Sequence, residues 1–297
     1  MRAMLQMELP FLISVAVLCW SSIKYSCALS DEVKYKYMDR DTTVKDINKR
    51  VSQTDVKFWS GKRDCQDVYD AGFRQSGVYE IQPRYVKRPY LAYCDMDVDA
   101  GYGWTVFQRR TDGSQNFERV WDDYKEGFGN ILNEVWLGNE ALFYITSSND
   151  RNYELLVQLS DWEGNDFDAL YGSFRIRHER YRYKLKLGKF LGGSANDSFS
   201  FHDNGYFSTL DRDHDDFDDK NCADRYKGGW WFKGCLESNL NGQYYHTSNS
   251  ASGRGVYWYW LGSRYNYSYK YASMKIRPVK ASKRKRKGRH AKTKKSG

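Results

Sequence analysis

Four cysteines, two near each end of one aromatic-rich region, constrain this chain more than any other feature of its sequence. Cys65 and Cys94 lie near the start of that region, and Cys222 and Cys235 lie near its end. An even number of cysteines is typical of disulfide-linked extracellular domains, and four cysteines allow three pairings. Neighbour pairing is the simplest, and each closed loop would contribute roughly 3 kcal/mol through the unfolded state. The alternative to disulfides is a zinc site with cysteine ligands, but no pair of these cysteines has the C-x2-4-C spacing of zinc sites.

The first thirty residues contain the two remaining cysteines, Cys19 and Cys27, and predict the compartment. An arginine precedes a run of twelve mostly apolar residues over 9–20, and small residues lead up to a cleavage site after Ser30. The pattern is typical of a secretory signal peptide, because so short a run does not span about 30 Å of hydrocarbon. We therefore expect residues 1–30 to be removed, the protein to be secreted to the extracellular space or matrix, and no membrane span to remain.

Basic residues are concentrated at the end of the chain. The formal net charge is +9, but the segment after Pro278 alone carries ten Lys and Arg and no acidic residue. In a secreted protein this density predicts binding of residues 280–295 to heparan sulphate or another matrix polyanion, in a contact that salt weakens. Nucleic acid is not an expected partner. A solvated tail without function and proteolytic cleavage within the basic tail, 280–297, are the alternatives.

The chain between the signal peptide and the tail divides into a spacer and one domain. Residues 31–61 are polar, with heptad-like apolar spacing for barely two turns and no Gly-X-Y run. Neither a long coiled coil nor a collagen stalk is encoded, so any oligomer must form by other means. Residues 62–279 contain no Pro/Gly/Ser-rich break of the kind that marks a domain boundary, which predicts a single domain.

Within that domain, apolar runs rich in β-branched and aromatic residues predict strands, and two amphipathic segments predict helices. Beyond residue 190 the sequence has little periodicity, and such a long irregular region needs cross-links or bound ions to hold it. No G-x-S-x-G, H-E-x-x-H or Cys/His nucleophile pattern occurs, so we expect no enzymatic activity. The strands are expected over 103–110, 141–148, 153–161 and 173–187, and the helices over 65–72 and 116–128.

Six ordered motifs carry a resemblance to a known family. They are CQDVYDAGFRQSGVYEIQP, YCDMDVDAGYGWTVFQRRTDGSQNFERVWDDYKEGFG, EVWLGNEALFYIT, NCADRYKGGWWFKGC, SNLNGQYY and MKIRP. Together they closely resemble the fibrinogen C-terminal (fibrinogen-related) domain family, which includes ficolin- and tachylectin-type lectins and the microfibril-associated glycoprotein. The resemblance implies an α+β fold with a central twisted, mainly antiparallel sheet and a loop-rich, calcium-stabilised C-terminal region. It also implies the disulfides Cys65–Cys94 and Cys222–Cys235.

The resemblance further implies a function in binding rather than catalysis. Members of the family are innate-immune lectins, extracellular-matrix and cell-adhesion proteins, or receptor ligands. We therefore expect a secreted, calcium-binding module that binds an extracellular protein and whose basic tail binds polyanions. The alternative is a lectin that recognises acetylated or other carbohydrate groups.

Aspartates are dense just before Cys222, where the family has a calcium loop. Two aspartates there give carboxylate ligands and two later residues give backbone carbonyls, the oxygen ligands that Ca2+ prefers. Carried over by motif, the carboxylates fall on Asp213 and Asp215. The carbonyls fall on Phe217 and Asp219, in a loop one residue longer than the usual pattern. An EF-hand is excluded, because its Gly and Glu positions hold other residues; a solvated acidic loop is the alternative.

The lectin-like members have an acetyl-binding pocket beside this loop, with aromatic walls and a cis peptide bond before a cysteine. The matching positions are Tyr226, Gly234, Cys235, Leu236 and Tyr265. Leu236 stands where the lectins have histidine, and Ser252 where they have tyrosine, so the pocket has lost its polar group. An aromatic core of a loop-rich region explains the rings as well as a pocket does.

Two further surface features are expected in the same half of the domain. Sequons at Asn196 and Asn266 predict N-linked glycans on surface loops. The tyrosines between residues 257 and 271 are expected to be exposed, where they would stack on sugars or form a protein interface.

Overall fold

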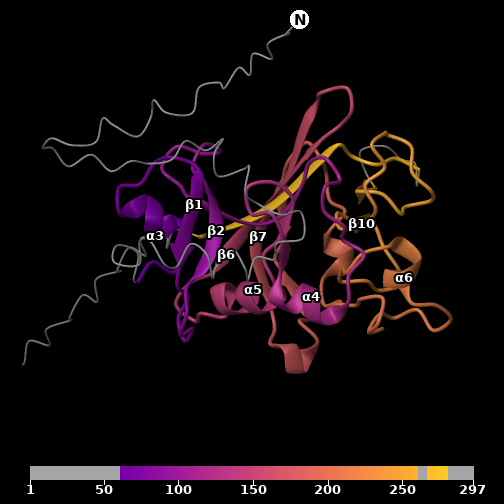
Figure 1. The fold of residues 1–297 in the computed structure, drawn as a ribbon, viewed down its shortest axis with the longest axis horizontal. Helices are drawn as coiled ribbons and strands as arrows, with labels where there is room; N and C mark the ends of the chain where they lie inside the picture. The colour runs from indigo at the N-terminus through magenta and orange to yellow at the C-terminus, as the bar shows by residue number, and fades with distance from the viewer. Residues whose placement is uncertain (1–60, 260–265, 280–297) are drawn as a thin grey trace, which may run out of the picture. The chain divides into compact units, whose positions relative to one another are not determined.

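A ten-stranded sheet organises residues 61–259 and 266–279, the part of the chain that the computed structural model describes (Figure 1). Its main order is β1-β2-β3-β12-β6-β7-β8, with β5 paired to β3 and β4, and β9 paired to β7. All of these pairings are antiparallel, which confirms the expected sheet. The strands are β1 (Gly77–Ile81), β2 (Tyr90–Asp95), β3 (Trp104–Arg110), β4 (Phe128–Gly129), β5 (Val135–Trp136), β6 (Tyr153–Ser160), β7 (Asp166–Ile176), β8 (Leu185–Leu187), β9 (Phe190–Gly192) and β12 (Tyr271–Pro278).

Short helices and one small hairpin complete the described part of the chain. The helices are α3 (Cys65–Asp70), α4 (Trp121–Glu126), α5 (Asn139–Thr146) and α6 (Cys222–Tyr226), with 3-10 turns η1 (Glu179–Tyr181) and η2 (Ser200–His202), and β10 (Ser238–Asn239) pairs with β11 (Tyr257–Trp258). The region between β9 and β12 is therefore rich in loops, as expected. None of the helices in the described ranges has the length and apolar character needed to cross a bilayer. The predicted signal peptide, nearly all of the predicted spacer, Tyr265 and the basic tail lie outside these ranges.

The last strand, β12, lies in the middle of the sheet. It pairs with β3 on one side and along its whole length with β6 on the other. Its residues 272–276 are all buried, including Lys275, whose Nζ donates to Asp95 at 2.5 Å and Gln158 at 2.6 Å. These partners offset the cost of burying an ammonium group. The end of the chain thus joins the two halves of the sheet.

The Cys65–Cys94 disulfide ties α3 to β2 at the start of the domain. The carboxylate of Asp64 begins the helix by accepting the N–H of Asp67, and it also accepts from Arg151 at 2.5 Å and from the Tyr153 hydroxyl at 2.7 Å. Burial raises the pKa of Asp64, and the guanidinium of Arg151 opposes that rise. The N-terminal cap of α3 is thereby anchored to β6.

The prediction of a strand over 141–148 is wrong, because most of these residues form α5. Ala141, Leu142 and Ile145 are buried, while Phe143 and Tyr144 are half-buried. That spacing is the buried face of a helix, and a short apolar run does not by itself distinguish a buried strand from a buried helix. Residues 139–146 therefore pack as a helix in spite of their β-branched and aromatic content.

Two other predicted elements are interrupted. Of the helix expected over 116–128, only α4 forms, and it ends at Gly127, where φ is 94°. The strand expected over 173–187 is split into the end of β7 and β8 by η1. His178 caps the start of η1 by accepting the N–H of Arg180. Arg182 ends η1 in the left-handed conformation, with φ of 54°. Side-chain capping and left-handed residues, which the hydrophobic pattern does not encode, cause both breaks.

Candidate functional site

The loops that follow β9 are built on a buried aromatic core. Trp230 and Trp231 are fully buried, and the Trp231 ring lies 5.2 Å from that of Phe207 and 6.0 Å from that of Trp136, centroid to centroid. The indole N–H of Trp231 donates to the carbonyl of Tyr183 at 2.9 Å. Such ring pairs contribute about 0.5–1.5 kcal/mol each beyond area burial. These tryptophans are therefore core residues, and they give the candidate site a rigid base.

Asp211 anchors the acidic loop to the rest of the domain. Its Oδ1 accepts the N–H of Trp121, the first residue of α4, at 2.8 Å and the Thr209 hydroxyl at 2.7 Å. The guanidinium of Arg212 lies 5.1 Å from the centre of the Trp121 ring. Asp211 thus supplies the cap that α4 otherwise lacks, and the loop is fixed at its start.

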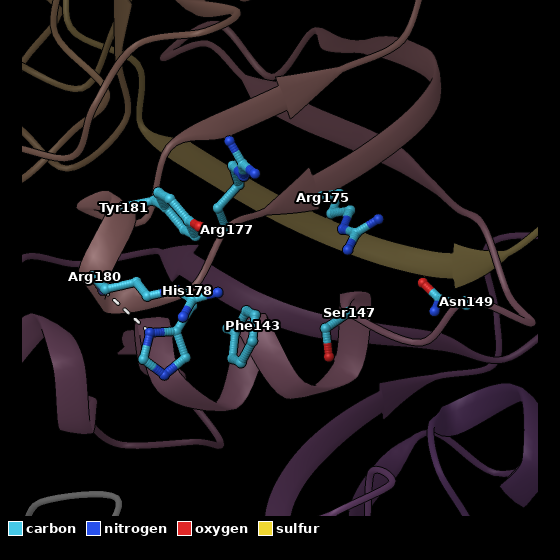
Figure 2. Close-up of a pocket in the computed structure, with 8 residues that line it drawn as sticks. All are labelled: Phe143, Ser147, Asn149, Arg175, Arg177, His178, Arg180 and Tyr181. Atoms are coloured by element: carbon cyan, nitrogen blue, oxygen red, sulfur yellow. Dashed lines mark hydrogen bonds between the residues drawn. The ribbon is translucent and has the colours of Figure 1, made fainter.

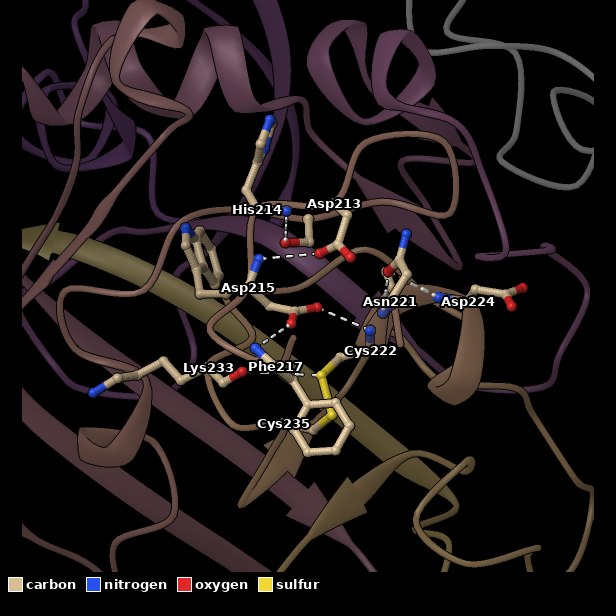
Figure 3. The surroundings of a disulfide bond; sticks show 12 residues. Asp213, His214, Asp215, Phe217, Asn221, Cys222, Asp224, Lys233 and Cys235 are labelled. Carbon is tan, nitrogen blue, oxygen red and sulfur yellow. Dashed lines mark hydrogen bonds between the residues drawn. A yellow bond between two sulfur atoms is a disulfide. The ribbon is translucent and has the colours of Figure 1, made fainter. Parts of the chain in front are cut away.

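Two aspartates further along the loop lie beside the Cys222–Cys235 disulfide (Figure 3). Asp213 Oδ1 accepts the N–H of Asp215 at 3.2 Å. The two carboxylate oxygens of Asp215 accept the N–H groups of Phe217 and Cys222, each at 2.9 Å. Asp215 is therefore held between its own loop and the first residue of α6.

The surroundings of Asp215 disfavour its negative charge. Burial raises the pKa of Asp215 to about 6, and the Asp213 carboxylate adds to the rise, while the two backbone hydrogen bonds oppose it. A cation bound next to both carboxylates removes their repulsion, and carboxylate oxygens are ligands that Ca2+ prefers. The donor chemistry of Asp213 and Asp215 therefore fits a hard divalent cation.

These carboxylates do not form a complete ligand set. Within the described ranges, no three His, Cys, Asp or Glu side chains are grouped as metal ligands. The remaining ligands would have to be backbone carbonyls and water, and the carbonyls of Phe217 and Asp219 stay a prediction. Both residues follow Asp215 in the same loop and are exposed.

Of the expected acetyl-pocket residues that the structure describes, Tyr226, Cys235 and Leu236 are buried and Gly234 is exposed. The Gly234–Cys235 bond is cis, as the resemblance implied. Tyr226 is 9% exposed and stacks on Phe232 with 6.3 Å between ring centroids, and Leu236 is 8% exposed. The tyrosine and the leucine both pack against the core. The cis bond is therefore present, with a buried apolar residue, Leu236, at the position where the lectins of the family have histidine.

His202 fixes the backbone that follows Leu236, and no sequence motif pointed to it. The ring is fully buried in η2. Its Nδ1 is 2.8 Å from the carbonyl of Trp231, and its Nε2 accepts the N–H groups of Glu237 at 3.3 Å and Ser238 at 3.1 Å. The ring is therefore neutral, with its proton on Nδ1. Its partners lie about thirty residues away along the sequence, which explains why sequence reasoning missed its role.

The expected surface features have different outcomes. Asn196 and Asn266 are exposed, so both are accessible to glycosylation, which stays a prediction. The expectation of exposed tyrosines is wrong for Tyr257 and Tyr269, each only 1% exposed. Both rings fill the core beneath the C-terminal loops. The tyrosines of this segment therefore do not form one continuous binding surface.

Comparisons with known proteins agree on the family. The family model for the C-terminal globular domain of fibrinogen beta and gamma chains matches residues 61–279. Fibroleukin of Bos taurus is 41% identical over 201 residues, which are 66% of this chain and 45% of that protein. The solved fibrinogen-like globe domain of human ANGPTL2 is 45% identical with a TM-score of 0.70, over 73% of this chain and 99% of that domain.

A lamprey fibrin D-dimer, solved in complex with the peptide Gly-His-Arg-Pro-amide, is 32% identical with a TM-score of 0.69, over 84% of this chain and 86% of that one. The chain spans less than half the length of the curated relatives it matches. The shared part is the globular domain, which contains every element described above.

Proposed function

Because the protein belongs to the family defined by the C-terminal globular domains of fibrinogen beta and gamma chains, whose members bind and do not catalyse, we propose that it is a secreted, calcium-stabilised ligand for an extracellular-matrix, cell-adhesion or receptor protein. One observation carries the preference for a protein partner over a sugar. Tyr226 and Leu236, at the expected acetyl pocket, are less than a tenth exposed, and Leu236 offers no hydrogen bond. A sugar site needs accessible polar groups to orient its ligand.

Calcium would be held by Asp213 and Asp215 through their carboxylates, with backbone carbonyls of Phe217 and Asp219 completing the set. Bound Ca2+ supplies positive charge that neutralises the carboxylate pair. The contribution of the protein's own residues is to hold the loop in position. Asp215 already links the loop to Cys222 through its hydrogen bond, and Asp211 fixes the other end on α4. The loop beside the expected pocket is thereby presented to a partner in one conformation.

Thermal melting of the full-length protein with and without calcium tests this site. An ion that binds only the folded state stabilises it by about 2.7 kcal/mol at a hundred times its dissociation constant, which is roughly 5–10 °C for a domain of this size. We expect Asp215→Asn to abolish the shift. Asp218→Asn, which removes an exposed carboxylate of the same loop, should keep it. No calcium shift in the unsubstituted protein, or equal loss in both variants, would refute the assignment.

A lectin function is the second candidate, because Tyr226 and Cys235 stand at positions that match the pocket of the family's lectins. Acetylated beads distinguish the two functions. Retention that free N-acetyl sugar or a chelator reverses would establish the lectin, and Tyr226→Ala should then abolish it. We expect no retention, because Leu236 replaces the polar group of the pocket.

The basic tail is proposed to hold the protein on matrix polyanions such as heparan sulphate. The test is a full-length protein in which every Lys and Arg of residues 280–295 is replaced by Gln. We expect elution from a heparin column at a lower salt concentration than the parent, because screening competes with exposed ion pairs. Unchanged elution would remove this role from the tail.

A further inference from the structure

Three arginines line an open groove of about 510 Å3 between α5 and the turn that follows β7 (Figure 2). Arg175 and Arg177 come from the end of β7 and the residue after it, and Arg180 comes from η1. The floor is formed by α5 and the residues after it, including Phe143, Ser147 and Asn149. All three arginine side chains are exposed. The groove lies on α5, β7 and η1, whereas the acidic loop precedes α6.

Local packing positions two of the three guanidinium groups of the groove. The side chains of Arg175 and Arg177 share one side of the strand, because the residue between them, Ile176, points into the core. The guanidinium groups of Arg177 and Arg180 lie over the Tyr181 ring, 4.2 Å and 4.8 Å from its centre. Cation–π contacts of this kind contribute about 0.5–1 kcal/mol at exposed sites. Arg177 and Arg180 are thus positioned by an aromatic ring and keep their N–H donors available.

His178 fixes the turn that carries these arginines. Its Nδ1 accepts the N–H of Arg180 at 3.1 Å, and its ring packs edge-on against Phe143 with 5.1 Å between centroids. The first contact sets the start of η1, and the second attaches η1 to α5. The side chain of His178 therefore joins the turn that carries the arginines to the floor of the groove.

The acidic residues nearest in sequence to the groove are already paired elsewhere. Glu179 accepts from Lys125 at 2.6 Å and from the Trp121 indole at 2.9 Å. Asp150, next to Asn149, pairs with Arg63 at 2.8 Å and Arg84 at 3.0 Å. Within residues 61–259 and 266–279, no carboxylate pairs with any of the three groove arginines.

The positive charge continues beyond the groove along the sequence. Four more basic residues follow within nine positions, in the turn and in β8 and the residues after it: Arg182, Lys184, Lys186 and Lys189. In the described part of the protein, these four also have no carboxylate partner. Lys186 of β8 pairs directly with Arg175 of β7 in the sheet, so the cations continue from the groove onto β8 and suit a long, repeatedly charged molecule better than a single charge.

We infer that this groove is a binding site for a sulphated polysaccharide. Guanidinium groups match the oxygens of sulphate in a bidentate geometry. The Asn149 amide can donate to sugar hydroxyls, and the Ser147 hydroxyl oxygen, whose proton is directed to the Tyr144 carbonyl, can accept from them. Phe143 and Tyr181 supply the only large apolar surfaces of the lining, which is too little to anchor an acidic peptide through buried side chains. The inference depends on the secretion proposed above, but not on the calcium site or the tail.

Binding of the full-length protein to immobilised heparin, at an ionic strength of about 0.15 M, tests the groove. The groove variant is Arg175→Gln, Arg177→Gln and Arg180→Gln together. The matched control removes the same charge from exposed arginines elsewhere: Arg74→Gln, Arg88→Gln and Arg254→Gln. We expect the groove variant to raise the dissociation constant about tenfold, which is about 1.4 kcal/mol for three exposed contacts, and the control to leave it within about twofold.

Two comparisons make the outcomes decisive. A variant with the tail neutralised and the groove intact separates the two proposals. If this variant loses heparin binding and the groove substitutions have no effect, the groove proposal is overturned and the tail proposal stands. Competition identifies the ligand class. Soluble heparin should displace the protein, and desulphated heparin or polyglutamate should not. Equal displacement by polyglutamate would replace the polysaccharide with an acidic peptide, and equal effects of the groove and control variants would reduce the site to nonspecific charge.

Discussion

Protonation of His202 should destabilise this domain as the pH falls below neutral. The imidazole is fully buried, and its Nε2 accepts the N–H groups of Glu237 and Ser238, so a second ring proton would have no acceptor. Burial lowers the pKa of His202 to about 4, and the hydrogen bond to Trp231 only partly opposes this. The folded state therefore holds the ring neutral over a pH range in which the unfolded protein binds a proton.

The sign and size of the effect follow from the two pKa values. The histidine pKa is about 6.5 in the unfolded protein and about 4 in the folded domain. The stabilising contribution is complete above pH 6.5, is lost as the pH falls from 6.5 towards 4, and changes no further below 4. Each pKa unit corresponds to about 1.36 kcal/mol, so His202 alone should remove about 2.7 kcal/mol by pH 4.5.

Denaturant unfolding of the parent and of His202→Gln, measured from about pH 4.5 to 7.5, isolates this contribution. We expect the variant to be less stable at pH 7.5, because a cavity remains and the acceptor is misplaced. The difference should shrink by about 2.7 kcal/mol at pH 4.5, since glutamine does not titrate. His246→Gln, at an exposed histidine, should show no such convergence. A difference between parent and His202→Gln that stays constant with pH would refute the reasoning.

Three further substitutions test the framework, each measured as the free energy of unfolding. Arg151→Met leaves the buried carboxylate of Asp64 without its guanidinium partner and should cost about 3 kcal/mol; a loss under about 1 kcal/mol would contradict this. Asp211→Ala removes the cap of α4 and should cost about 1 kcal/mol, and an unchanged midpoint would show that the cap is dispensable. Gly103→Ala places a Cβ 2.2 Å from a backbone carbonyl oxygen and should cost roughly 1–3 kcal/mol, whereas Gly77→Ala, whose nearest contact is 3.9 Å away, serves as its control.

The features that could be predicted from the sequence are those carried by local motifs. The resemblance implied both disulfides and the cis bond before Cys235, and the structure contains all three. The strands expected over 103–110 and 153–161 form as β3 and β6, because their apolar patterns continue without a capping residue. The Asp213 carboxylate accepts the N–H of Asp215, a contact that two aspartates two residues apart make across a single turn, while their role as calcium ligands stays a prediction.

The features that the sequence did not predict depend on contacts between segments that are distant in the sequence. Residues 139–146 form a helix because their buried face meets the sheet, which the run of apolar letters did not reveal. The groove arginines lie in the segment that was predicted as one strand over 173–187. The basic residues that alternate from Arg175 to Lys189 also indicated a charged surface, and the strand prediction did not use that signal. The burial of Leu236 and the role of His202 required the position of η2, which is set by the core around Trp231.

The central place of β12 has a consequence for how this protein is made. The strand that completes the interior of the sheet is the last of the described elements to leave the ribosome, so β3 and β6 have unpaired edges until then. Unpaired strand edges invite association with other polypeptides, so the nascent domain is exposed to such association until Pro278 has emerged. A premature stop shortly before β12 would thus be about as damaging as one near the start of the domain.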